Sequence, residues 1–252
     1  MNRYIFIVSL LFGLLVAPCF SQRHTDAVAL LKRVAATYES MKSYHFEEDE
    51  DATTPGLNAI SHDRSSKKIM YSRQGKYLRE SWRTVDGHHI DVCDGEYTYN
   101  YDFSRNQYSK YKSGSPDLSR DIALSFTAYY YFVVDPDFKG AKVIGKASIM
   151  VGNTWRQCTI VQMDQPSSAD LHENSMETRN SPITFWVDEK SLTVVRDSMS
   201  FSFQDKDPKA IIRNTKFCVV TSYRIAEVNI ELPDSLFVIK IPKDAKEIRL
   251  QE

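Results

Sequence analysis

The chain has 252 residues and is nearly neutral, with 32 Lys and Arg against 33 Asp and Glu and a formal net charge of −1. It lacks the basic excess and the clustered Lys and Arg of nucleic-acid-binding proteins, so we exclude nucleic acid as a partner. Its length suits one large domain or two small ones. No linker rich in Pro, Gly or Ser divides it, so we expect one domain.

The first 21 residues have the pattern of a cleaved secretory signal peptide. Arg3 precedes an apolar run over residues 4–17, which is short for a membrane span of about 20 residues. We therefore predict a signal peptide at 1–21 and a mature domain at 22–252 that is periplasmic or otherwise exported. The alternative is a lipid anchor on Cys19. Pro18 argues against that anchor, because its rigid ring lies where such signals carry a small residue.

The mature chain begins with a predicted amphipathic helix over residues 25–42. Thr25 suits the N-cap, and apolar residues recur at steps of three and four. These residues are Ala27, Leu30, Leu31, Val34, Tyr38 and Met41. One face of the helix is therefore expected to be buried.

Short strands with tight turns dominate the rest of the chain. We predict strands at residues 44–48, 68–73, 76–83, 88–93, 97–103, 107–111, 143–151, 155–163, 183–187, 193–203, 217–223 and 237–241. The Asp-Gly pairs at 86–87 and 94–95 are typical of hairpin turns. Residues 49–66 and 165–181 are expected to be largely loop. Sequential strands with short turns indicate antiparallel pairing.

A second predicted helix, over residues 115–136, interrupts the strands. Ser115 can cap it, Pro116 suits its first position and Pro136 closes it. Its apolar stripe consists of Leu118, Ile122, Phe126, Tyr130 and Val133.

The strand at 97–103 carries four aromatic rings in strict alternation with hydrophilic residues. Because successive side chains leave opposite faces of a strand, these rings share one face. Each ring buries roughly 150 to 250 Å², so the row needs a second layer of protein or an apolar ligand. The four residues are Tyr97, Tyr99, Tyr101 and Phe103.

Roughly eleven strands and two helices make a flat sheet improbable, because two helices cannot cover it. We predict a mainly β fold with helices, in which a strongly curved antiparallel sheet, an incomplete β-barrel, wraps around two or so α-helices. Its inner wall forms the expected hydrophobic cavity. The predicted lining residues are Tyr97, Tyr99, Tyr101, Phe103, Ile122, Phe126, Phe185, Val187, Phe217, Val219 and Tyr223.

Neither a metal site nor a catalytic motif is evident. His88 and His89 point to opposite faces of a strand, and the acidic run at 47–51 lacks the ligand-and-glycine pattern of calcium loops. Nucleophile elbows, Cys-x-x-Cys pairs and phosphate-binding glycine loops are also missing. We expect no cofactor and no enzyme activity.

Three cysteines follow the signal peptide, namely Cys93, Cys158 and Cys218. An exported protein can form at most one internal disulfide from them, and one thiol is left over. Their spacing does not choose the pair.

Several short motifs, taken together, give the chain a family resemblance. They lie at 38–46, 75–81, 94–101 with Gln107-Tyr108, 185–188 with 194–196, and 232–247. In order and spacing the chain resembles the superfamily of bacterial outer-membrane lipoprotein carriers and lipoprotein-sorting proteins, of LolA/LolB-like fold, which also includes a sigma-factor regulator.

That resemblance implies an open sheet that holds acyl chains in a cavity lidded by helices. It also implies an arginine that holds the lid closed, for which Arg79 is the nearest match and Arg73 the alternative. The implied partners are a lipid or the acyl chains of a lipoprotein, with a membrane-bound donor or acceptor protein. We expect a monomer.

Three functional hypotheses follow. The leading one is an exported, non-enzymatic protein that binds a lipid or lipoprotein acyl chains for transport to the outer membrane. The alternative is an envelope signalling or sensor module of the same fold that binds a protein partner. The third is a secreted hydrolase, which would need a nucleophile beside a base such as His45, His62 or His172.

Overall fold

The computed structural model describes residues 26–248 except 56–59, 73, 85–86, 115–131, 133–137, 139, 165–175, 181 and 206–213. The predicted signal peptide therefore lies outside the described residues. Nearly all of the second predicted helix, with Ile122 and Phe126, lies outside them too. Within the described residues, a helix at 26–40 accompanies a single 13-stranded sheet.

The strands of this sheet follow one another along the chain with few interruptions. They are β1 (Ser43–Pro55), β2 (Ile60–Ser72), β3 (Lys76–Arg83), β4 (Gly87–Cys93), β5 (Tyr97–Asp102), β6 (Gln107–Lys112), β7 (Lys142–Val151), β8 (Thr154–Met163), β9 (Met176–Asn180), β10 (Ile183–Asp188), β11 (Val194–Asp205), β12 (Asn214–Val228) and β13 (Lys246–Glu247).

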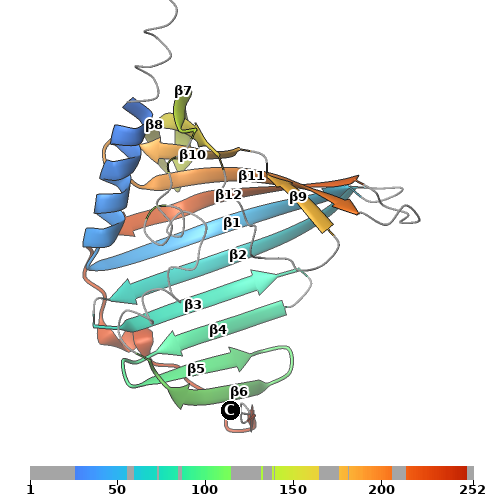
Figure 1. Cartoon of the computed structure of the whole chain (residues 1–252). Helices are drawn as coiled ribbons and strands as arrows, with labels where there is room; N and C mark the ends of the chain where they lie inside the picture. Colours follow the sequence, from blue (N-terminus) through green and yellow to red (C-terminus); the bar gives the residue numbers. More distant parts are fainter. Residues whose placement is uncertain are drawn as a thin grey trace, which may run out of the picture.

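The strand order is β13-β6-β5-β4-β3-β2-β1-β12-β11-β10-β8-β7, with β9 paired to β11 (Figure 1). All pairs are antiparallel except β13 with β6. Gly87 and Gly95 adopt positive φ angles of 82° and 101° in the predicted Asp-Gly turns. The predicted antiparallel meander is therefore confirmed.

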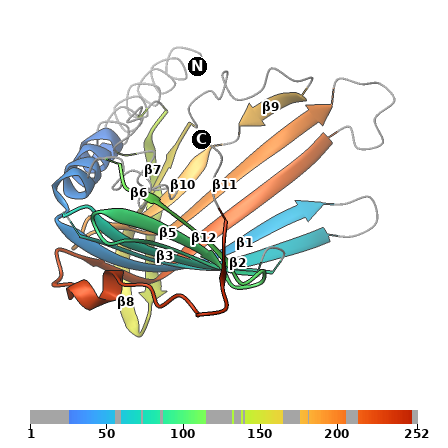
Figure 2. The same ribbon diagram turned by 90° about the horizontal axis from the view of Figure 1, so that it is seen from below.

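The sheet curves around the side on which the helix lies (Figure 2). We call this side of the sheet the helix face and the opposite side the outer face. The predicted apolar stripe of the helix is buried except at Leu30, which is half-buried, and it joins one cluster with sheet residues such as Phe46 and Phe185. Tyr38 packs near Phe46, with ring centroids 6.5 Å apart. The curved, mainly β architecture is as predicted.

The end of the chain covers part of the outer face. A short 3-10 helix, η2 (Asp234–Phe237), places Phe237 in a second apolar cluster with Met70 and Val92. The predicted strand at 237–241 is therefore wrong. This segment packs across the sheet instead of pairing with an edge, because Leu236 and Phe237 fill the gaps between outer-face side chains.

Two predicted loops also contain strands. β1 continues to Pro55 and β2 starts at Ile60, so most of the 49–66 passage is a long hairpin. Its polar residues pair across the strands, as Lys67 does with Glu50, so its stability does not depend on an apolar alternation. Within the predicted 165–181 loop, β9 pairs with β11.

Candidate ligand-binding face

The helix face is apolar where it lies closest to the start of β1. The cross-strand register aligns Tyr44, Tyr71, Tyr77 and Cys93, and all four side chains are buried. The Tyr44 and Tyr71 rings stack with centroids 5.3 Å apart. This first row is a continuous apolar wall across four strands.

The second row, two residues further along β1, changes character across the sheet. It begins with buried Phe46 and Ile69 and continues on β3 and β4 with Arg79 and Asp91. Arg79 donates from Nε to Asp91 Oδ2 at 2.8 Å, and Asn100 donates to the other carboxylate oxygen. The sheet thus becomes polar on the same face, away from the helix.

The third row contains a buried charged cluster. Glu48 is 1% exposed and lies between Tyr223 on β12 and Lys67 on β2. Lys67 Nζ lies 3.3 Å from a Glu48 oxygen and 3.0 Å from a Glu50 oxygen. Burial raises the pKa of Glu48 although Lys67 opposes this shift. For Lys67, burial favours the neutral form, but the two glutamates outweigh it and raise its pKa.

Asp197 on β11 completes this cluster. It is fully buried, opposite Thr221, and no hydrogen bond reaches either carboxylate oxygen within the described part of the chain. Burial, followed by the charge of Glu48, raises the pKa of Asp197 to about 8. Asp197 is therefore mostly protonated at neutral pH, and this relieves the repulsion within the cluster.

The helix contributes one polar group to this region. The Val194 backbone N–H donates to the Tyr38 hydroxyl at 3.2 Å, and burial raises the pKa of Tyr38. At the end of the helix, the Lys42 backbone N–H donates to Asn229 Oδ1 at 2.9 Å. These two hydrogen bonds tie the helix to the strands on which it packs.

Several predicted cavity residues do lie on the helix face. Phe185, Val187 and Tyr223 are buried in the apolar cluster beneath the helix, and Val219, on the same face, is half-buried. Phe217 lies on β12, but its side chain is outside the described part. Arg79 is on the helix face and paired with Asp91, and its lid-holding role stays a prediction.

The structure places the aromatic row of β5 on the outer face, so the prediction that it lines the inner wall is wrong. Tyr99 and Tyr101 lie opposite Val92 and Ile90, which pack with the C-terminal segment. Tyr97 shares their face by alternation, and Phe103, just beyond β5, is exposed and packs on Tyr101 with centroids 4.5 Å apart. The polar residues between them, such as Thr98, face inward.

Sequence reasoning missed the charged cluster of Glu48, Lys67 and Asp197. A signal was present, because Glu48 continues the alternation of Tyr44 and Phe46 and must share their face. The carboxylate of Glu48, expected on the buried face, could have indicated a charged cluster there.

Other predicted features are simple to place. No disulfide joins Cys93, Cys158 and Cys218, the cysteines among the described residues, and burial raises the pKa of Cys158 to about 11. Among the described residues, no three His, Cys, Asp or Glu side chains gather as a metal site would require. No helix in the described ranges is long and apolar enough to cross a bilayer.

No family model matches the chain, and no curated protein matches it. Solved structures similar to it include the lipoprotein LppX of Mycobacterium tuberculosis, at 13% identity and a TM-score of 0.44, covering 83% of this chain and 98% of that one. A LolA superfamily protein of Nitrosomonas europaea is similar at 10% identity and a TM-score of 0.30, with 84% and 97% covered.

A putative outer membrane lipoprotein-sorting protein domain from Vibrio parahaemolyticus is similar at 6% identity and a TM-score of 0.32, with 85% and 97% covered. The last two carry in their names the group that the sequence motifs resemble. The similarity concerns the fold alone.

Proposed function

We propose that this chain is an exported, non-enzymatic binding protein that holds the acyl chains of a lipid or lipoprotein against the helix face. The observation that carries this proposal is the amphipathic character of that face. Apolar rows around Tyr44 and Phe46 pass, within two residue steps, into the charged cluster around Glu48. A surface of this kind matches an amphiphile with an apolar tail and a polar head.

The apolar rows supply a suitable driving force. Removing a methylene group from water is favourable by about 0.8 kcal/mol, so an acyl chain binds with little need for directed hydrogen bonds. The helix already covers these rows and serves as the lid in this proposal. In this proposal the helix moves aside for the acyl chain and gives up hydrogen bonds such as those that tie Tyr38 to Val194 and Lys42 to Asn229.

The polar rows form the binding site of the head group in this proposal. Lys67 and Arg79 lie there beside carboxylates, so both donors and acceptors are available. The proposal includes export through residues 1–21 and a monomeric mature domain at 22–252. It also includes delivery between a membrane-bound donor and an acceptor, with transport to the outer membrane as the biological outcome.

Lipid extraction followed by mass spectrometry tests the proposal directly. The mature chain, purified without detergent, is expected to yield co-purified lipid. After delipidation it should take up a fatty acid that carries a photoreactive diazirine. Cross-links are expected on helix-face residues of β1, β2 and β12, and not on the outer-face row of Tyr97, Tyr99 and Tyr101.

Two outcomes would contradict the proposal. One is a protein without extractable lipid that also fails to take up the probe. The other is labelling confined to the outer face. If such a protein captures a defined envelope protein, the sensor-module alternative is the better description of its function.

A further inference from the structure

The outer face carries a cross-strand row with a different chemistry. The register aligns one residue from each of seven neighbouring strands, β4, β3, β2, β1, β12, β11 and β10. In that order they are His88, Trp82, Ser66, Asp49, Ser222, Arg196 and Trp186. We call this row the outer trough.

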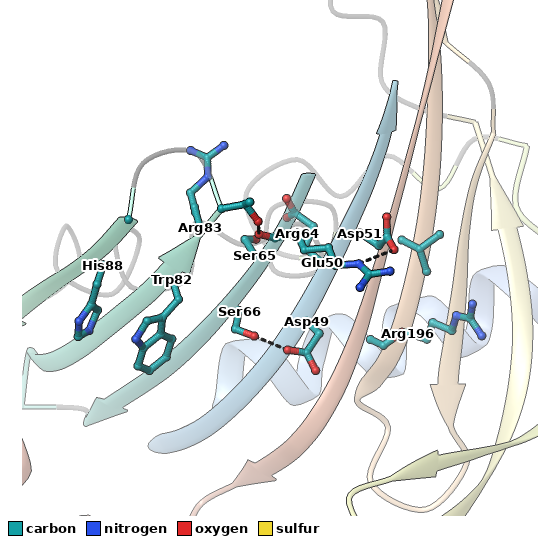
Figure 3. Close-up of a pocket in the computed structure, with 14 residues that line it drawn as sticks. Asp49, Glu50, Asp51, Arg64, Ser65, Ser66, Trp82, Arg83, His88 and Arg196 are labelled. Carbon is teal, nitrogen blue, oxygen red and sulfur yellow. Dashed lines mark hydrogen bonds and ion pairs between the residues drawn. The ribbon is translucent and has the colours of Figure 1, made fainter. Parts of the chain in front are cut away.

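The outer trough is hollow between its ends. Six of its residues, all except Trp186, line a pocket of about 750 Å³ (Figure 3). A second pocket of about 420 Å³ adjoins it and shares Trp82 and Ser66. Trp82 and Arg196 are four strand spacings apart, or about 19 Å, so the trough suits an elongated ligand.

An aromatic platform closes one end. Trp82 is 38% exposed, and one side of its indole stacks on His88 at a centroid distance of 5.0 Å. His88 is in turn stacked on Phe103 at 3.8 Å and accepts or donates a hydrogen bond with Glu80 at 2.8 Å. The indole is thus supported from behind, and it borders both pockets.

A cation lies at the other end. The Arg196 guanidinium is 5.2 Å from the centroid of the Trp186 ring, which supports it by a cation–π contact. Arg196 forms no ion pair within the described residues, and its Nε is buried without a hydrogen-bond partner there. It therefore remains available to an anionic group.

The floor between the two ends is low and polar. Ser66 and Ser222 are short, and Ser66 donates to the Asp49 carboxylate, which also pairs with Arg224 at 3.1 Å. In the next row Asp51 pairs with Arg64 at 3.4 Å. These pairs neutralise one another and still present donors and acceptors side by side.

This chemistry excludes several occupants. An acyl chain would bury the floor charges without compensation, which is costly. A nucleic acid would bring phosphates against Asp49 and Asp51, which disfavours it. A peptide adds to a sheet at an open edge, whereas the trough crosses strands whose backbones are already paired.

We propose that the outer trough binds an extended oligosaccharide that carries an acidic group. The apolar face of one sugar ring would stack on the free side of Trp82, since an indole offers a rigid amphipathic platform. Hydroxyl groups would exchange hydrogen bonds with Ser66, Asp49 and Ser222. A sugar carboxylate would form a charge-assisted hydrogen bond with Arg196.

Binding of two matched probes tests this inference. Cellotetraose and a cellotetraose in which one terminal glucose is replaced by glucuronate, called the acidic tetrasaccharide, have equal length and linkage and differ by one carboxylate. Their affinities are measured by calorimetry and tryptophan fluorescence. The acidic tetrasaccharide is expected to bind and to change the fluorescence, because Trp82 and Trp186, two of the three tryptophans, flank the trough. Cellotetraose is expected to bind more weakly.

Variants locate the site. Trp82→Ala is expected to lower affinity for the acidic tetrasaccharide at least about tenfold, as loss of an aromatic contact implies. Trp82→Phe should retain most of the affinity. Arg196→Gln should weaken binding of the acidic tetrasaccharide about tenfold and leave the affinity for cellotetraose unchanged. Trp155→Ala is the matched control, because Trp155 is 62% exposed on β8 outside the trough.

The inference is overturned if neither saccharide binds a folded protein, or if Trp155→Ala weakens binding as much as Trp82→Ala does. Equal binding of both probes would remove the role given to Arg196. Circular dichroism and thermal unfolding confirm that each variant is folded. Because the trough lies opposite the helix face, lipid content is expected to be unchanged in Trp82→Ala, so the two proposals can fail separately.

Discussion

Glu48 and Asp49 are consecutive residues of β1 with the same chemistry, and they meet opposite environments. Glu48 points to the helix face, where it is buried in a cluster with Lys67 and Asp197. Asp49 points to the outer face, where Ser66 and Arg224 satisfy it near solvent. The comparison shows that one strand supports two sites of different chemistry. Burying a charge on the helix face costs free energy, whereas on the outer face the charge stays near solvent.

The largest expected difference between the faces concerns packing. Phe46→Ala is expected to lower the free energy of unfolding by about 3 to 5 kcal/mol, because it leaves a cavity in the helix-face core. Phe103→Ala, at an exposed outer-face ring, should cost less than about 1.5 kcal/mol. Urea denaturation of both variants measures the two losses in the free energy of unfolding. Equal losses would show that the outer face is packed as tightly as the helix face.

The next largest expected effect comes from the buried carboxyl group of Asp197. Its pKa is raised on folding, whereas paired carboxylates usually have a lowered pKa. The pKa of Asp197 rises from an ordinary 3.8 to about 8 in the folded protein. The folded state therefore keeps a proton that the unfolded state loses, so the contribution of Asp197 to stability is complete below about pH 4 and is lost as the pH rises to about 8. Glu48 shifts in the same direction, and Glu50 and Lys67 also face this site.

Asp197→Asn is expected to stabilise the protein at pH 7 by roughly 2 to 4 kcal/mol and to flatten this pH dependence. The estimate follows from about 1.36 kcal/mol per pKa unit, partly offset because the buried amide also lacks partners. Asp49→Asn is the matched control on the outer face and should not be stabilised. Denaturation curves between pH 4 and 8 are the measurement, and unchanged stability of Asp197→Asn across that range would contradict the assignment.

Lys67→Met tests how the cluster is balanced. Removing the cation leaves Glu48 and Glu50 without it, and we expect a loss of about 2 kcal/mol at pH 7, reduced because Lys67 is partly exposed. The loss should shrink at acidic pH, where Glu48, whose pKa is raised by burial, takes up a proton. Arg64→Met, which removes an exposed outer-face cation, should change stability by less than about 0.5 kcal/mol. A loss that persists at low pH would indicate that packing of the lysine stem is the cause.

The parts of the fold that local patterns determine could be predicted. The stripe from Ala27 to Met41 identified the helix, and the Asp-Gly pairs at 86–87 and 94–95 identified two hairpins, because both depend on near neighbours. The 49–66 hairpin was missed since its strands are held by cross-strand pairs such as Glu50 with Lys67, which leave no apolar alternation.

The inner wall could be predicted only in part. Alternation showed that Tyr97, Tyr99 and Tyr101 share a face but not which face is inner, and the C-terminal segment, distant in sequence, covers part of the outer one. Phe185 and Tyr223 were placed correctly on the helix face because their strands are apolar on that side. Asp197 could not be found, since its burial depends on pairing between β11 and β12.

The smallest expected effect tests whether the ion pair between Arg224 and Asp49 stabilises the fold or positions Asp49 for ligand binding. Arg224 pairs with Asp49 at 3.1 Å while half exposed, so Arg224→Gln should cost at most about 0.5 kcal/mol. If the pair instead serves to hold Asp49 in the outer trough, the same variant should weaken binding of the acidic tetrasaccharide more than it weakens folding. Parallel measurements of affinity and unfolding decide between the two roles, because a purely structural ion pair would leave the affinity of the folded protein unchanged.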